Sequence, residues 1–62
     1  MKTYNANEDI RRAISEKRLF NYEVAEKLGV SEFTFARWLR YELSEEKKEL
    51  VLNAINELAS EN

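Results

Sequence analysis

The sequence lacks cysteine, histidine and proline, and it contains a single glycine. Without cysteine there is no disulfide bond, and without cysteine and histidine the usual zinc-binding sets cannot form. Because proline is absent and glycine occurs once, extended and loop-rich architectures are disfavoured. We expect a helical protein, and the absence of cysteine fits a cytoplasmic location.

Long hydrophobic runs are also missing. No stretch approaches the run of about 20 apolar residues that a membrane-spanning helix requires. The N-terminal segment has no apolar stretch behind Lys2, so no signal peptide is expected. These observations predict a protein without a membrane-bound part.

The sequence offers little for catalysis. It has neither histidine nor cysteine to serve as a general base or nucleophile, and no glycine-rich loop to hold a phosphate. Two carboxylate pairs, Glu8–Asp9 and Glu45–Glu46, stand at expected helix starts, where the helix dipole favours negative charge. We therefore expect no enzymatic activity, and no metal, cofactor or small-molecule ligand.

Charged residues are plentiful and unevenly distributed. The 62 residues have a net charge of −2, and 44% of them are hydrophobic, which is too many for a disordered chain. Residues 1–20 carry five basic and three acidic side chains, residues 21–41 carry three of each, and residues 42–62 carry two basic and six acidic ones. Nucleic-acid-binding domains are usually basic, so the total argues mildly against that function. Because the acidity lies mainly in the last third, a basic face can still exist elsewhere.

The spacing of apolar residues predicts one all-α domain over residues 1–62. Apolar side chains recur three or four residues apart, which is the repeat of a helix with one buried face. Asn7, Ser31 and Ser44 precede three of the expected helices and are good N-caps. Both ends, residues 1–6 and 60–62, are expected to fray. The four expected helices span about residues 8–18, 21–28, 32–41 and 45–59.

The stretch from Asn21 to Arg40 predicts two short helices joined by a tight turn. Gly29 stands where the chain must change direction, and glycine readily adopts the left-handed conformation that closes a helix. The small Ala25 allows the two helices to cross closely, and Phe35 and Trp38 lie on the inner face of the second helix. This arrangement is typical of a helix-turn-helix, whose second helix enters the major groove of DNA.

The same stretch resembles a known family. Val24-Ala25, Leu28-Gly29-Val30-Ser31, Phe35 and Trp38 follow the order and spacing of the phage-repressor-like (lambda-repressor or XRE-type) helix-turn-helix family of bacterial and phage regulators. The resemblance extends more weakly over residues 8–58, and it is greatest to small proteins of phages and mobile elements in low-GC Gram-positive bacteria. It implies sequence-specific binding to double-stranded DNA and a role in transcription regulation.

Two departures from the family pattern stand out. The family often places serine or threonine and then glutamine at the start of the first helix of the motif, where this sequence has Phe20 and Asn21. We expect Phe20 to pack with Leu19 under that helix, and Asn21 either to donate to a phosphate, with a shorter reach, or to cap the helix. The C-terminal dimerisation domain of full repressors has no counterpart, which predicts a minimal DNA-binding unit.

The expected DNA contacts fall into two groups, those that read base edges and those that hold phosphates. In the first group, Arg37 can pair with guanine through two hydrogen bonds, and Phe33 can pack on thymine methyl groups. The residues expected at base edges are Glu32, Phe33, Thr34 and Arg37. The residues expected at phosphates are Asn21, Tyr22, Ser31, Arg40, Tyr41, Lys17 and Arg18.

Several of these residues keep a second interpretation. Phe33 can instead cover a dimer interface or a neighbouring loop, and Glu32 can act only as a helix cap. Arg37 and Arg40 can pair with carboxylates, including Glu32 or Glu26, an interaction worth about 0–1 kcal/mol at a surface. Lys17 and Arg18 can belong to a solvated face.

The last expected helix offers a possible partner surface. Leu50 and Leu52 flank its inner stripe and cannot both be deeply buried, so one of them can serve a homodimer contact or lie at the rim of the core. The alternative function is a small protein–protein interaction module, an inhibitor or recruitment factor, built on the same fold. The acidic last helix would suit a basic partner.

Overall fold

The computed structural model describes residues 6–61, and the regular structure of this part is entirely helical. The four expected helices are present, which confirms the all-α class. Three boundaries differ from those expected. The first helix ends at Glu16 and the third at Trp38, both earlier than predicted, whereas the fourth continues to Glu61. The helices are α1 (Glu8–Glu16), α2 (Asn21–Leu28), α3 (Glu32–Trp38) and α4 (Glu45–Glu61).

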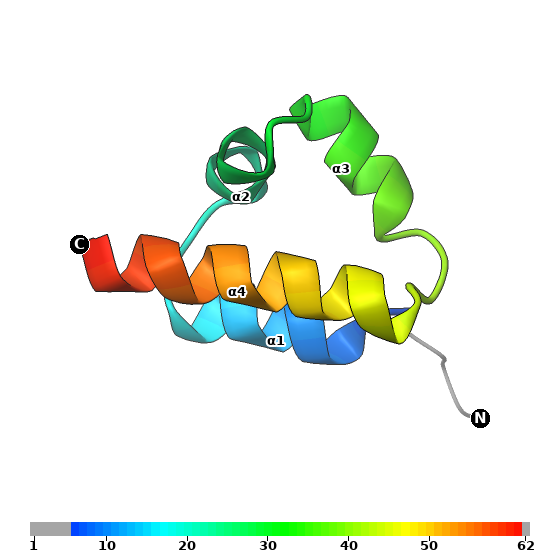
Figure 1. Cartoon of the computed structure of the whole chain (residues 1–62), viewed down its shortest axis with the longest axis horizontal. Coiled ribbons are helices and arrows are strands. Elements are labelled where there is room, and N and C mark those ends of the chain that lie inside the picture. The colour runs from blue at the N-terminus through cyan, green and yellow to red at the C-terminus, as the bar shows by residue number, and fades with distance from the viewer. Residues whose placement is uncertain (1–5, 62) are drawn as a thin grey trace.

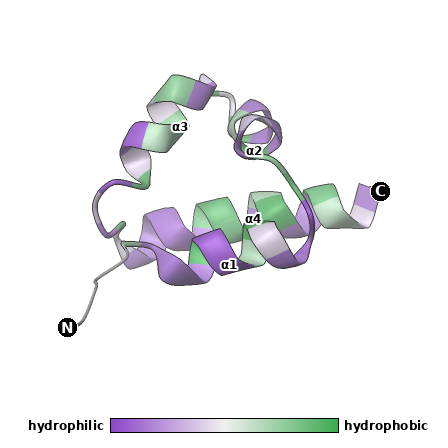
Figure 2. Ribbon diagram, turned by 180° about the vertical axis from the view of Figure 1, so that it is seen from behind, coloured by the Kyte–Doolittle hydropathy of each residue, from purple (hydrophilic) through white to green (hydrophobic). Residues whose placement is uncertain are grey.

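The helices form two layers. Helices α1 and α4 run side by side in the same direction, and α2 and α3 lie together on one side of this pair (Figure 1). Helix α2 contacts both α3 and α4, so it joins the two layers. Hydrophobic and hydrophilic stretches alternate along α4, as expected for a helix with one buried side (Figure 2).

The buried hydrophobic residues among positions 6–61 form one core between the layers. Its members are aliphatic except for Phe35, which is fully buried. Trp38 lies at the edge of this core, partly buried, with its ring 6.3 Å from that of Phe35 in an edge-on arrangement. The Lys47 ammonium lies 4.3 Å from the Trp38 ring centre and covers its outer side. The core residues are Ile10, Ile14, Leu19, Val24, Ala25, Phe35, Leu39, Val51 and Ile55.

The turn between α2 and α3 forms as the sequence predicts. Gly29 closes α2 with a φ of 82°, in the left-handed region that glycine adopts without a steric cost. The Ser31 hydroxyl then caps α3 by accepting a hydrogen bond of 3.0 Å from the Thr34 amide. At the start of α4, the Ser44 hydroxyl accepts a hydrogen bond of 3.3 Å from the Lys47 amide in the same way.

Asn7 does not cap α1 with its side chain, which corrects the expectation. Its backbone is left-handed, with φ 58°, and its side chain is fully buried. The side-chain amide donates hydrogen bonds to the carbonyls of Leu39 (3.2 Å) and Tyr41 (2.8 Å). The side-chain oxygen accepts a hydrogen bond of 2.9 Å from the Leu43 amide. Asn7 therefore fixes the shape of the α3–α4 connection, residues 39–44.

The segments expected to fray, residues 1–6 and 60–62, belong only in part to the described residues. Residues 1–5 and 62, which belong to the segments expected to fray, lie outside the described residues. Ala6 is buried, and residues 60–61 form the last turn of α4. There, the Glu61 carboxylate accepts a hydrogen bond of 2.7 Å from the Lys27 ammonium on α2. Among residues 6–61, no helix combines the length and the hydrophobicity required to cross a lipid bilayer.

Candidate nucleic-acid interface

The outward side of α3 carries the most distinctive exposed surface. Phe33, Ala36, Arg37 and Arg40 recur at helical spacing, so they point to the same side, and together they line one hollow. The Phe33 side chain is 73% exposed although it is fully apolar. After Trp38 the backbone tightens, and the Arg40 amide donates a hydrogen bond of 3.1 Å to the Arg37 carbonyl. This turn keeps Arg40 beside Arg37.

The two arginines of this surface keep their charges available. Among residues 6–61, neither Arg37 nor Arg40 forms an ion pair, although the chain has ion pairs elsewhere. Pairing with Glu26 or Glu32, the second interpretation from the sequence, is therefore not observed. Both guanidinium groups are exposed and can donate hydrogen bonds to phosphate or to base acceptors.

The hydroxyl groups at the start of α3 are used within the protein. The Ser31 hydroxyl caps the helix and also donates a hydrogen bond of 3.0 Å to the Thr34 hydroxyl. Thr34 is half-buried, whereas Ser31, Glu32 and Phe33 are exposed. A contact of Ser31 or Thr34 with DNA would therefore have to share or replace these bonds.

The start of α2 places two aromatic rings on the surface. Phe20 is 63% exposed, which corrects the expectation that it packs under α2, while Leu19 is buried as expected. The Phe20 ring stacks on the Tyr22 ring, with centres 5.7 Å apart and planes 9° from parallel. The Glu23 carboxylate accepts a hydrogen bond of 2.8 Å from the Phe20 amide. Asn21 is exposed in this turn, as a phosphate contact requires.

The remaining phosphate candidates lie at opposite ends of the molecule. Lys17 and Arg18 belong to the α1–α2 connection, whereas Arg40 and Tyr41 belong to the α3–α4 connection, and Figure 1 shows these connections at opposite ends. All four residues are exposed. The structure therefore joins Arg40 to the α3 surface but does not bring Lys17 and Arg18 into it.

Sequence reasoning missed the residues that position the α3–α4 connection. Besides Asn7, the Arg11 guanidinium donates hydrogen bonds of 3.0 Å to the carbonyls of Leu39 and Ala6. Arg11 and Asn7 together thus hold the backbone of Leu39, and Asn7 also holds that of Tyr41 and Leu43. An asparagine before a helix looks the same in sequence whether it caps that helix or binds a distant loop, so no local signal distinguished the two roles.

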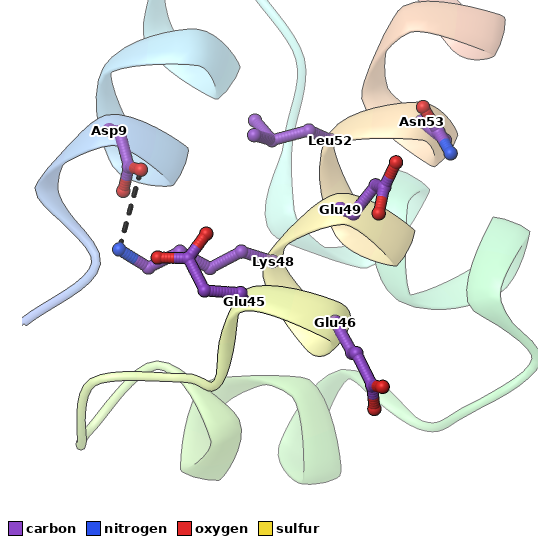
Figure 3. A pocket seen from close by; sticks show the side chains of 7 residues that line it. All are labelled: Asp9, Glu45, Glu46, Lys48, Glu49, Leu52 and Asn53. Carbon is purple, nitrogen blue, oxygen red and sulfur yellow. Dashed lines mark hydrogen bonds and ion pairs between the residues drawn. The ribbon is translucent and has the colours of Figure 1, made fainter.

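A second hollow, between α1 and α4, is lined mainly by charged side chains (Figure 3). Lys48 crosses it and pairs with Asp9 at 3.4 Å and with Glu42. The described part of the chain contains no group of three or more carboxylates arranged to hold a metal ion. Through its two ion pairs, Lys48 compensates negative charge in this hollow and ties α4 to the start of α1. The lining residues are Asp9, Glu45, Glu46, Lys48, Glu49, Leu52 and Asn53.

The two leucines of α4 have different environments. Leu50 is 53% exposed, whereas Leu52 is partly buried and packs against the core. The expectation that they are not both deeply buried is confirmed. A homodimer contact through Leu50 stays a prediction.

Comparison of the chain with protein-family models, curated proteins and solved structures finds no match. The resemblance to the phage-repressor-like family therefore stays a prediction based on residues 21–40.

Proposed function

We propose that this protein binds double-stranded DNA in a sequence-specific manner, with the outward side of α3 in the major groove. The observation that supports this most is that Arg37 and Arg40 are exposed and form no ion pair among residues 6–61, beside the exposed Phe33 on the outward side of α3. The major groove is about 12 Å wide and admits one α-helix. A role in transcription regulation of a phage or mobile element is part of the proposal and rests on the family resemblance.

The proposed contacts divide by chemistry. Arg37 lies within α3 and pairs with a guanine edge, where its fork of donors matches two acceptors. Arg40 follows the helix end and, with Tyr41, contacts the flanking phosphates. At the start of α2, Asn21 and Tyr22 contact a phosphate near the positive end of that helix.

The uneven charge of the chain is compatible with this proposal. Five of the carboxylates belong to α4, which lies in the other layer from α3 (Figure 1). A duplex that contacts α3 therefore meets Arg37 and Arg40 before it meets the acidic helix. The affinity of a monomer is expected to be modest, because few phosphates are neutralised.

The test is duplex binding at several salt concentrations. Fluorescence anisotropy should show a Kd that rises by about 3- to 12-fold between about 50 and 200 mM salt, because one or two guanidinium contacts release counterions on binding. Arg37→Ala should weaken binding to a selected site by about 5- to 150-fold and relax the preference at one guanine. Arg40→Ala should weaken binding to all sequences and lower the salt slope by about one.

Arg12→Ala is the matched control, because Arg12 is an exposed arginine on α1 that pairs with Glu8 at 3.2 Å. It removes the same charge away from α3 and should leave the Kd within about twofold, as expected for a charge outside the contact surface. Absence of duplex binding at low salt, or an equal loss in all three variants, would contradict the proposal.

A second candidate function is supported by the exposed aromatic rings. Phe20, Tyr22, Phe33 and Tyr41 are between 52% and 76% exposed. Aromatic residues are enriched where proteins contact one another, so these rings also fit a protein–protein interaction module. In that case Phe33→Ala would abolish partner binding, and the wild-type protein would bind no duplex DNA even at low salt.

A further inference from the structure

The hollow on α3 combines two kinds of wall. The Phe33 ring and the Ala36 methyl group are apolar and exposed, and Arg37 and Arg40 supply guanidinium groups beside them. Neither arginine forms an ion pair among residues 6–61. A site for phosphate alone would gain nothing from the apolar wall, so the hollow fits a ligand with a small apolar group next to hydrogen-bond acceptors.

The major groove presents this combination at defined sequences. Thymine carries a methyl group at its groove edge, and guanine carries two acceptors, N7 and O6. We infer that the hollow receives the 5-methyl group of a pyrimidine in the base pair next to a guanine bound by Arg37. The inference rests on the proposed function and adds the chemical group that determines specificity.

The geometry assigns separate roles to the two walls. Phe33 and Ala36 lie one helical turn apart and enclose the methyl group, while Arg37 lies one turn beyond Phe33 and reaches the neighbouring pair. Burial of one methyl-sized group changes an equilibrium by about fourfold. The same fourfold change applies to 5-methylcytosine against cytosine, because these bases, like thymine and uracil, differ by a methyl group at ring position 5.

The experiment uses the best duplex from a random-sequence selection. Each thymine is replaced in turn by uracil, and each cytosine by 5-methylcytosine, and the Kd is measured by fluorescence anisotropy. At one thymine beside a guanine, replacement by uracil should weaken the affinity of the protein for the duplex by about fourfold. Replacing the same thymine by cytosine and by 5-methylcytosine should give two affinities that differ by about fourfold in favour of the methylated base.

Two variants assign the effect to the hollow. In Phe33→Ala, the ratio of the affinities for the thymine and uracil duplexes should be close to one, while salt-dependent duplex binding persists. Phe20→Ala removes another exposed ring outside the hollow and should keep the ratio of the wild-type protein. Circular dichroism of both variants checks that the helices are retained.

The results that overturn the inference are distinct from those that overturn the proposed function. Salt-dependent duplex binding with equal affinity for thymine and uracil at every position overturns the inference alone. The same conclusion follows if Phe33→Ala keeps the ratio of the affinities for thymine and uracil, or if the selected sites lack a thymine beside a guanine. Absence of salt-dependent duplex binding overturns both.

Discussion

At the scale of single residues, Asn7 shows how one side chain determines the path of a distant segment. Its three side-chain hydrogen bonds reach residues 32 to 36 positions away along the chain. The left-handed backbone of Asn7 is a conformation that asparagine tolerates better than most residues. Asn7 therefore positions the backbone of Arg40 and Tyr41 without touching a proposed ligand.

Replacement of Asn7 tests this role. Asn7→Ala should lower the free energy of unfolding by about 2–4 kcal/mol, because buried backbone groups lose their partners and alanine is strained at this φ. Asn7→Gly relieves the strain and should recover part of the loss. Urea denaturation measures both, with Asn56→Ala on the exposed side of α4 as control, expected within about 0.5 kcal/mol of wild type. Equal stability of Asn7→Ala and wild type would remove the positioning role.

The residues predicted correctly are those whose roles depend on near neighbours. Gly29 and Ser31 act within the turn that contains them, so the sequence alone identifies both. The predictions for Asn7 and Phe20 are wrong because the environments of these residues depend on tertiary packing. The buried side chain of Asn7 binds the α3–α4 connection, and of the two neighbours Leu19 and Phe20 only Leu19 enters the core.

At the scale of helices, the ends of α1 and α3 differ from the predicted ends for structural reasons that helix propensity does not show. Helix α1 stops at Glu16 because Arg18 turns left-handed, with φ 57°, and the Leu19 amide bonds back to the Ile14 carbonyl. No glycine marks this end. Helix α3 stops at Trp38 where the connection held by Asn7 begins. The apolar repeat was correct in each case, and only the ends needed the three-dimensional structure.

Helix α2 is tied to the end of α4 by Lys27. Its ammonium lies 2.7 Å from the Glu61 carboxylate and 3.5 Å from that of Glu57. The hydrogen bond to Glu61 raises the pKa of Lys27, and that to Glu42 raises the pKa of Lys48. A lysine whose pKa is higher in the folded state than in the unfolded state stabilises the folded state. The full contribution is present below the pKa of the unfolded state, about 10.4, and it is lost as the pH rises through the pKa of the folded state.

We therefore predict an alkaline loss of stability that these two lysines control. The unfolding free energy should decrease above about pH 10.4, and it should decrease less in the variant with Lys27→Arg and Lys48→Arg, because arginine keeps its charge there. Lys17→Arg changes an exposed lysine and should follow the wild-type curve. Urea denaturation from neutral to strongly alkaline pH measures the effect. Superimposable curves for all three proteins would contradict it.

At the scale of the whole molecule, the fold class was predictable and the functional surface only partly so. Four apolar repeats separated by caps leave few alternatives to a small helical bundle, and the structure has that form. The sequence also placed Phe33, Arg37 and Arg40 on the outer side of α3. It did not show that both arginines lack an ion pair within residues 6–61, or that Lys17 and Arg18 lie apart from them, because these facts depend on how the layers pack.

The central claim is that α3 presents the DNA-binding surface, and a titration observed by amide chemical shifts tests it most directly. Isotope-labelled protein is titrated at low salt with a duplex from the selection. The largest shifts should fall on residues 31–41 and on Asn21 and Tyr22, while residues around Leu50 in α4 change little. Shifts concentrated around Leu50, or no shifts at saturating duplex, would contradict the account.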